Sequence, residues 1–155
     1  MKLLIGSYAA KLDASGRVKI PEKFREVIEE TYGKDVVVTS LANEAVQVYP
    51  LPVWERMTGA NPEMTLSLQP TIRKFLAQVN FQGNHQQLDP KGRVLIKQTL
   101  RDKAQLPDEV EVVGMTSHLE IWNKRNLERM LEEKPLTDED FETIAKLLTP
   151  RGKSE

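Results

Sequence analysis

The residues of this sequence best suited to a chemical role form an Asp-x-x-x-Arg element, which occurs twice. The first copy holds Asp13 and Arg17, and the second holds Asp89 and Arg93. The arginine guanidinium is planar and permanently charged, so it can pair with a phosphate or a guanine edge through two parallel hydrogen bonds. An aspartate four residues earlier can accept hydrogen bonds from the backbone of the turn that it begins. The element therefore indicates a rigid turn that aims a cation at an anion.

Each element is part of a longer internal repeat. Residues 11–25 (KLDASGRVKIPEKFR) and residues 87–101 (QLDPKGRVLIKQTLR) share seven identical residues at a constant offset of 76 positions. The similarity resumes between residues 35–49 and residues 109–122. Such agreement is difficult to obtain by chance, so we expect one structural unit to be present twice.

Basic residues gather in both copies of the repeat. They are Lys11, Arg17, Lys19, Lys23 and Arg25 in the first copy, and Lys91, Arg93, Lys97, Arg101 and Lys103 in the second. The acidic residues among them are Asp13, Glu22, Asp89 and Asp102. If a pseudo-twofold axis relates the copies, their turns approach each other and present paired arginines. Such a surface suits duplex DNA, whose phosphates repeat regularly and whose major groove admits a two-stranded β-ribbon.

The candidate DNA-binding residues follow from this arrangement. Arg17 and Arg93 are the candidates for contact with a groove. Supporting phosphate contacts, some of which can instead be structural, are expected from Lys11, Lys19, Arg25, Lys91 and Arg101. Turn-shaping roles are expected for Asp13, Gly16, Asp89 and Gly92, since glycine tolerates a positive φ. A purely structural interpretation stays open, in which each arginine pairs with a carboxylate and the element is an ordinary hairpin.

The elements that must position these residues have the same order in both repeats. In the first repeat we expect strands over 7–12, 17–20, 35–40 and 45–49, a helix that Pro21 opens, and a closing helix near 53–57. In the second we expect strands over 81–88, 93–96, 109–115 and 118–122, and helices over 97–104 and 123–131. A unit of about 50 residues buries too little apolar surface to be stable alone. We therefore expect a β-rich α+β fold in which the repeats form one pseudo-twofold barrel with peripheral helices.

The remaining segments connect or extend the repeats. Residues 62–70 are a predicted linker, residues 71–77 a predicted helix, and residues 150–155 a tail that frays. Thr137 and Asp140 form a predicted capping box for a helix that continues to Leu148. The expected organisation is a first repeat over 5–60, a linker and helix over 61–78, a second repeat over 79–134, and a C-terminal helix and tail over 135–155.

Bulk composition narrows the classes of function. Hydrophobic residues make up 39% of the chain and charged residues 29%, as in globular domains. The absence of cysteine excludes disulfides and thiolate metal sites and suits a reducing cytoplasm. No apolar run approaches the ~18 residues of a membrane span, and residues 1–7 are too short for a secretory signal, so no membrane partner is expected.

The net charge of −1 conceals an uneven distribution along the chain. Residues 1–127 contain 17 lysines and arginines against 15 aspartates and glutamates, and the acidic excess lies in the C-terminal stretch. Local fields govern binding more than net charge does. The acidic stretch fits three interpretations: it is a solvated helix face, it contacts basic residues of a neighbouring subunit, or it weakens non-specific DNA binding.

The sequence contains no convincing set of residues for catalysis or for metal binding. His85 and His118 are the two histidines, they lie in different repeats, and no ligand spacing accompanies them. Phosphate-binding glycine loops and nucleophile elbows are absent. Asp13 and Asp89 are disfavoured as a catalytic pair, because each has an arginine partner four residues later. We expect no catalytic residues, no metal and no cofactor, with a small enzyme as a remote alternative.

The doubled Asp-x-x-x-Arg element, with its Gly-Arg-Val-x-Ile strand and the Arg that follows Phe or Leu, resembles the MraZ family of bacterial regulators. This family is related to the AbrB/SpoVT superfamily of swapped-hairpin DNA-binding domains. Residues 46–56 (VQVYPLPVWER) and 118–124 (HLEIWNK) are also similar to the family's pattern, and the resemblance covers about residues 5 to 131. Two positions depart from that pattern: Ser15 stands where lysine is common, and Lys97 stands where proline is usual.

The resemblance implies a fold and a function. Two tandem AbrB-like swapped-hairpin repeats would form the barrel within one chain. The implied function is sequence-specific DNA binding and transcriptional control, generally repression of the division and cell-wall gene cluster that encodes the regulator. The implied partners are double-stranded DNA with repeated promoter boxes and further copies in a ring-shaped homo-oligomer, in the cytoplasm and on the nucleoid. The alternative that stays open is a protein-interaction barrel without DNA binding.

Overall fold

The computed structural model describes residues 2–59 and 69–148. Within the chain there are two compact units, Met1–Lys124 and Arg125–Glu155. The predicted tail over 150–155 lies outside the described residues, as does the predicted linker over 62–70 except for its last two residues. Gln69 caps a helix with its side chain and Pro70 begins that helix.

The strands of the larger unit follow the order expected for two similar repeats. In the first repeat they are β1 (Ser7–Lys11), β2 (Arg17–Lys19), β3 (Asp35–Thr39) and β4 (Val46–Pro50). In the second they are β5 (Asn84–Gln87), β6 (Arg93–Leu95), β7 (Glu109–Gly114) and β8 (Leu119–Trp122).

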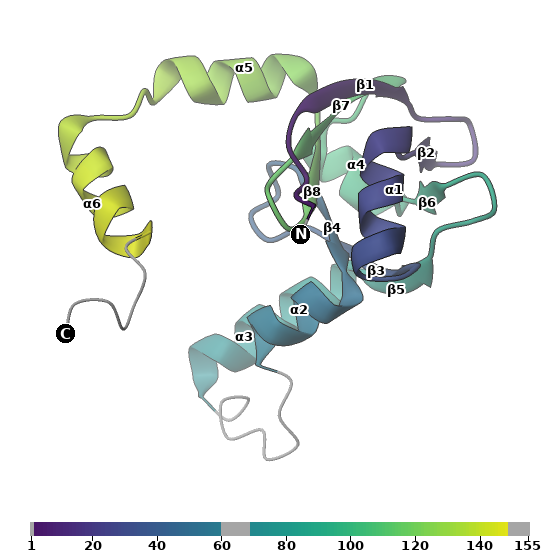
Figure 1. Ribbon diagram of the computed structural model, residues 1–155, viewed down its shortest axis with the longest axis horizontal. Coiled ribbons are helices and arrows are strands. Elements are labelled where there is room, and N and C mark those ends of the chain that lie inside the picture. The colour runs from purple at the N-terminus through teal and green to yellow at the C-terminus, as the bar shows by residue number, and fades with distance from the viewer. Residues whose placement is uncertain (1, 60–68, 149–155) are drawn as a thin grey trace. The chain divides into compact units, whose positions relative to one another are not determined.

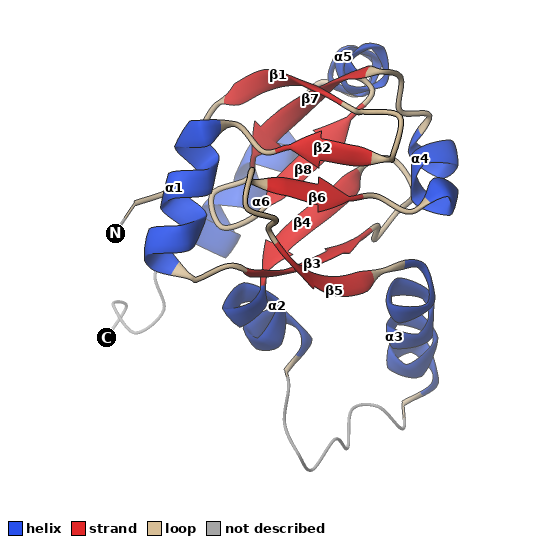
Figure 2. Ribbon diagram, turned by 90° about the vertical axis from the view of Figure 1, so that its right-hand side faces the viewer, coloured by secondary structure: helices blue, strands red, loops and turns tan. Residues whose placement is uncertain are grey.

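Strands of one repeat pair with strands of the other. A six-stranded antiparallel sheet has the order β1-β7-β8-β4-β3-β5 (Figure 2). The first strand of each repeat pairs with the third strand of the other, and the two fourth strands, β4 and β8, pair at the centre. The order reads the same in both directions when equivalent strands are exchanged, which is the pattern that pseudo-twofold symmetry requires.

Closure of the predicted barrel is not found among the described strands. β2 and β6 pair with each other as a separate two-stranded ribbon, and β1 and β5 are left at the two edges of the larger sheet. Each ribbon strand has three residues and pairs with its equivalent in the other repeat. The ribbon lies over the sheet (Figure 2). Beside β1, Leu12 forms an isolated bridge with Val18, and in β5 the Gln86 side chain bonds to the N–H and the carbonyl of Leu95.

Helices flank the sheet and the ribbon. The larger unit contains α1 (Glu22–Thr31), α2 (Leu51–Thr58), α3 (Pro70–Gln82) and α4 (Gln98–Ala104). Figure 2 shows α1 and α4 at opposite ends of the ribbon, as the pseudo-twofold relation requires. Pro21 caps α1 with an extended ψ of 139° and is not the first helical residue. Within the described residues, no helix is long and apolar enough to cross a membrane.

The helix α3 is longer than expected, and the strand after it is shorter. The sequence predicted a strand from residue 81, whereas α3 continues through Gln82 and β5 begins at Asn84. The Gln82 side chain donates to the Ser40 carbonyl at 2.9 Å, which holds this last turn of the helix against the first repeat. At Gly83 a Cβ atom would lie 2.6 Å from the Thr39 Cβ, so the chain passes β3 too closely for any side chain there.

The smaller unit contains α5 (Lys124–Glu133, whose first residue closes the larger unit) and α6 (Asp138–Leu148). The predicted capping box is confirmed at the start of α6. The Asp140 N–H donates to Thr137 Oγ1 at 3.1 Å, and the Thr137 N–H donates to Asp140 Oδ2 at 2.9 Å. These reciprocal bonds satisfy backbone donors that a helix start otherwise leaves open.

One hydrophobic core serves both repeats. Equivalent residues contribute to it in pairs: Val18 with Val94, Ile20 with Ile96, Phe24 with Leu100, and Ile28 with Ala104, all at most 2% exposed. Burial of a valine or isoleucine side chain stabilises a fold by about 1.5–3 kcal/mol. Neither repeat can bury these side chains without the other, so the shared core positions both turns relative to each other.

Candidate nucleic-acid interface

The first turn is organised around the Asp13 carboxylate. Asp13 Oδ1 accepts hydrogen bonds from the backbone N–H groups of Ser15 (3.0 Å) and Arg17 (2.9 Å) and from the Ser15 hydroxyl (2.6 Å). The Gly16 N–H donates to the Asp13 carbonyl at 3.0 Å. Gly16 has a φ of +87°, a conformation that side chains disfavour and glycine accepts. The Ser15 hydroxyl above all, with the Arg17 N–H next, lowers the pKa of Asp13.

The second turn repeats this backbone geometry. Asp89 Oδ1 accepts from the N–H groups of Lys91 (2.9 Å) and Arg93 (2.8 Å), and the Gly92 N–H donates to the Asp89 carbonyl at 2.8 Å. Gly92 has a φ of +76°. Burial acts to raise the pKa of Asp89, but the hydrogen bonds from Arg93 and Lys91 outweigh it and leave the pKa lowered. Both aspartates are therefore held in their charged form.

The ribbon joins the two turns through main-chain bonds. Val18 lies opposite Val94 in the ladder, Arg17 lies opposite Leu95, and Lys19 lies opposite Arg93. The Ile20 N–H donates to the Gly92 carbonyl (2.9 Å), and the Ile96 N–H donates to the Gly16 carbonyl (2.8 Å), so each strand is fixed to the turn of the other repeat. Figure 1 shows the two turns, one purple and one teal, projecting from the same side of the unit.

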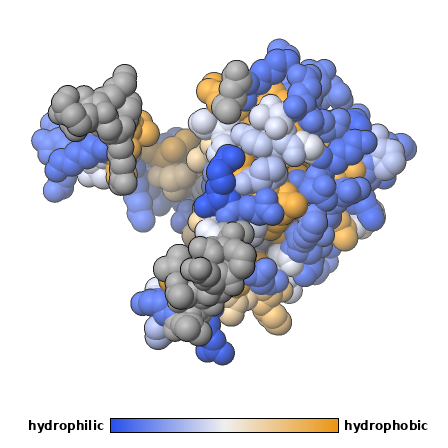
Figure 3. All heavy atoms as spheres, turned by 60° about the horizontal axis from the view of Figure 1, so that its bottom comes forward, coloured by the Kyte–Doolittle hydropathy of each residue, from blue (hydrophilic) through white to orange (hydrophobic). Residues whose placement is uncertain are grey.

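Strand alternation decides which side chains face outward. Val18 and Val94 are fully buried, so this face of the ribbon is the inner one. Because alternate residues of a strand point to opposite faces and paired residues share a face, Arg17, Lys19 and Arg93 lie on the outer face. We call this face, together with Lys91 in the second turn, the cationic platform. Figure 3, in which the turns are again at the right, shows this side of the molecule mostly hydrophilic.

Arg25 and Arg101 support the turns of the opposite repeat. Arg25 Nη2 donates to the Pro90 carbonyl at 3.1 Å, and its Nε donates to Glu29 at 3.1 Å. Arg101 Nε donates to the Ile96 carbonyl at 3.0 Å, and its guanidinium packs over Gly16. These two predicted phosphate contacts are thus half-buried and engaged within the protein, which leaves less of their charge available to a ligand.

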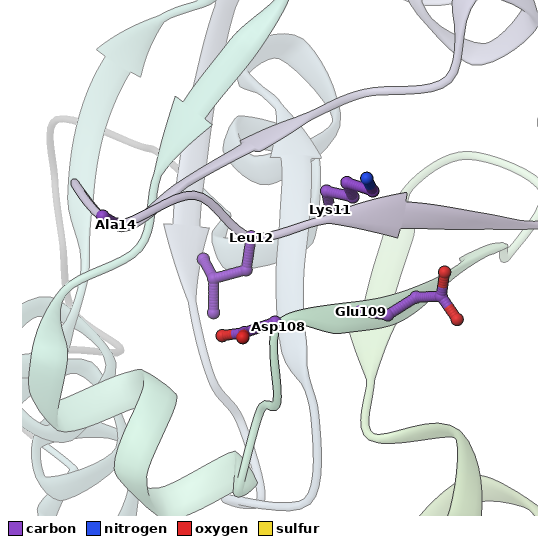
Figure 4. A pocket seen from close by; sticks show the side chains of 5 residues that line it. All are labelled: Lys11, Leu12, Ala14, Asp108 and Glu109. Atoms are coloured by element: carbon purple, nitrogen blue, oxygen red, sulfur yellow. The ribbon is translucent and has the colours of Figure 1, made fainter.

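The three lysines predicted to contact phosphate have different surroundings. Lys19 and Lys91 are exposed, and across the part of the chain that the structure describes no carboxylate lies within 4 Å of either ammonium. Lys11 is also exposed, but it lies opposite Glu109 at the end of β1, beside an open pocket that Asp108 also lines (Figure 4). Lys11 therefore has two acidic residues as neighbours at this edge of the sheet.

Sequence reasoning did not identify two contributors to this interface. Ser15 binds Asp13 and accepts a hydrogen bond from Arg17 Nη1 at 3.2 Å, and its signal was the difference from Lys91 at the equivalent position. The Pro90 carbonyl that receives Arg25 had no sequence signal, since the two residues are 65 positions apart. Among the described residues, no cluster of histidine and acidic side chains is placed to hold a metal ion.

Known proteins resemble this chain over most of its length. The MraZ protein family, described as antitoxin-like, matches residues 3–73 and again residues 81–149. The Transcriptional regulator MraZ of Acidobacterium capsulatum is 35% identical over 140 residues, which are 90% of this chain and 95% of the relative. The proteins of the same name from Koribacter versatilis and Syntrophobacter fumaroxidans are 33% and 31% identical, over 92% and 95% of this chain and 97% and 95% of the relatives. Each matched segment contains one of the two turns.

Proposed function

Because the chain belongs to the MraZ family, we propose that it is a sequence-specific DNA-binding transcriptional regulator. The relatives named Transcriptional regulator MraZ support the regulatory role. The observation that carries the DNA-binding role is the cationic platform, on which Arg17, Lys19 and Arg93 share the outer face of a two-stranded ribbon. A ribbon of this kind fits the major groove, and its cations suit the flanking phosphates.

The proposed interface has a centre and a periphery. Arg17 and Arg93 form the centre, and Lys19 and Lys91 contact phosphates beside it. Lys11 lies at the edge of the interface, while Arg25 and Arg101 contribute mainly by supporting the turns. Asp13, Gly16, Asp89 and Gly92 shape the turns, which is consistent with the hydrogen bonds of the two aspartates and the positive φ values of the two glycines.

The proposal extends to architecture and assembly. The exchange of strands between repeats supports a swapped-hairpin arrangement with repeats over 5–60 and 79–134, joined by a linker and helix over 61–78 and followed by a C-terminal segment over 135–155. We propose that several chains form a ring-shaped homo-oligomer that binds repeated promoter boxes. One platform carries few unpaired cations, so simultaneous binding of several platforms would supply the missing affinity.

The proposed biological role is repression of the division and cell-wall gene cluster that encodes the chain. The protein would act in the cytoplasm on the nucleoid, without cofactor, membrane partner or catalytic activity. The regulator names of the relatives support a non-enzymatic role.

The test is binding of the full chain to a fluorescent duplex from its own upstream region, at a series of salt concentrations. We expect affinity to fall steeply with salt, because each phosphate contact releases about 0.9 counterions. The Arg17→Ala/Arg93→Ala variant should lose binding but keep its assembly state. Arg73→Ala/Lys74→Ala removes the same charge from the exposed face of α3 and should bind normally.

Two results would count against DNA binding at the platform. A flat salt response would show that phosphate contacts do not dominate. Equal affinities for the platform variant and the α3 variant would favour the alternative, a protein-interaction module without a DNA role.

A further inference from the structure

The two arginines of the repeated turns have different surroundings, although their sequence positions are equivalent. Arg93 Nε donates to Asp89 Oδ2 at 2.7 Å, and Arg93 Nη1 lies 3.5 Å from Asp13 Oδ2 in the other repeat. Arg17 Nη1 donates to the Ser15 hydroxyl, and no carboxylate of residues 2–59 or 69–148 lies within 4 Å of its guanidinium. One guanidinium is thus paired with two carboxylates, and the other faces solvent with a neutral partner.

A single difference between the repeats accounts for this asymmetry. Ser15 occupies the position that Lys91 holds in the second turn. The Ser15 hydroxyl binds Asp13 Oδ1 and accepts from Arg17, so Arg17 is held away from its own aspartate. Asp13 Oδ2 then remains available to Arg93 from the other repeat. In the second turn no hydroxyl intervenes, and Arg93 binds Asp89 directly.

The consequence is a difference in what each arginine can offer a nucleic acid. Two carboxylates balance the charge of Arg93, and contact with a phosphate would require it to give up a short charge-assisted hydrogen bond. Its position between Asp13 and Asp89 also ties together two turns that are distant in the sequence. Resting on the proposed DNA binding, we infer that Arg93 does not share the groove contact proposed for Arg17 but is a positioning residue that clamps both turns, so that Arg17, Lys19 and Lys91 face the DNA.

The experiment compares Arg93→Gln and Arg93→Lys with Arg17→Gln and Arg17→Lys in the full chain. Affinity for the upstream duplex is measured against salt, and Tm is measured without DNA. Arg17→Gln should lower affinity about tenfold with unchanged Tm and reduce the slope of log K against log salt by about 1, whereas Arg17→Lys should keep the slope. Arg93→Gln and Arg93→Lys should both lower Tm and affinity with the slope unchanged, because lysine cannot span two carboxylates.

A double-mutant cycle with Asp13→Asn tests the clamp itself. If Arg93 acts through Asp13, the Tm loss of the double variant is smaller than the sum of the losses of Arg93→Gln and Asp13→Asn. Additive losses would overturn the inference, as would a shallower salt slope in Arg93→Gln that Arg93→Lys restores. If the unmodified chain binds no DNA, the proposed function fails, and the cycle on Tm still decides whether the clamp exists.

Discussion

Replacement of Gly92 by alanine tests how tightly the two repeats are packed at the turns. Gly92 has a φ of +76°, and an added Cβ would lie 2.8 Å from Arg25 Cδ. The left-handed backbone costs a residue with a side chain about 1–2 kcal/mol. Displacement of Arg25 from the Pro90 carbonyl forfeits a hydrogen bond worth about 0.5–1.5 kcal/mol. Together these losses destabilise the fold by about 1.5–3.5 kcal/mol.

Two other glycines separate the backbone cost from the packing cost. Gly33 has a φ of +97° with nothing within 4 Å of an added Cβ, so Gly33→Ala should show the backbone cost alone. Gly16 has a φ of +87°, and its added Cβ would meet the flexible end of Arg101 at 3.1 Å. Gly16→Ala should therefore fall between Gly33→Ala and Gly92→Ala in the free energy of unfolding.

The assay is urea unfolding followed by circular dichroism, at one protein concentration because assembly shifts apparent stability. A loss of stability in Gly92→Ala that only equals that of Gly33→Ala would refute the reasoning. It would mean that Arg25 moves aside at no cost and does not support the second turn.

Three further outcomes follow from the structure. The pKa values of Asp13 and Asp89 lie below 3.8 in the folded chain, so both carboxylates stabilise the fold above that pH and cease to do so as the pH falls through their folded pKa values. Tm should therefore drop on acidification below about pH 4. The Tm of Asp89→Asn should drop less over the same pH range. Ile96→Ala should cost about 2–5 kcal/mol in urea unfolding, because Ile96 is fully buried in the shared core. Thr137→Ala should weaken the start of α6 by about 0.5–2 kcal/mol, visible as faster amide exchange at Asp140 and little change in the larger unit.

Local patterns were sufficient where one segment determines its own structure. Aspartate, glycine and arginine at fixed spacing predicted the two turns, because the aspartate bonds to N–H groups two and four residues later. Thr137 and Asp140 predicted the start of α6 through bonds that span three residues.

Features of the fold that local sequence patterns did not predict depend on contacts between segments distant in the sequence. The extension of α3 to Gln82 depends on a bond to Ser40, which is 42 positions away. The separate ribbon depends on pairing between β2 and β6, whose equivalent residues lie 76 positions apart in the sequence. The partners of Arg25 and Arg93 in the opposite repeat lie 65 and 80 positions away, so no spacing within one repeat revealed them.

Fusion of two similar units in one chain allows their turns to differ. In a dimer of identical chains, a residue that keeps one arginine away from its aspartate does the same to the equivalent arginine. No arginine is then left to join the two turns. Here Ser15 and Lys91 occupy equivalent positions, and the arginine beside each has a different partner. The backbone of the ribbon keeps the twofold pattern, with Ile20 bonded to Gly92 and Ile96 bonded to Gly16. Symmetry in the main chain thus fixes the position of the platform, while asymmetry in the side chains divides contact and support between its two halves.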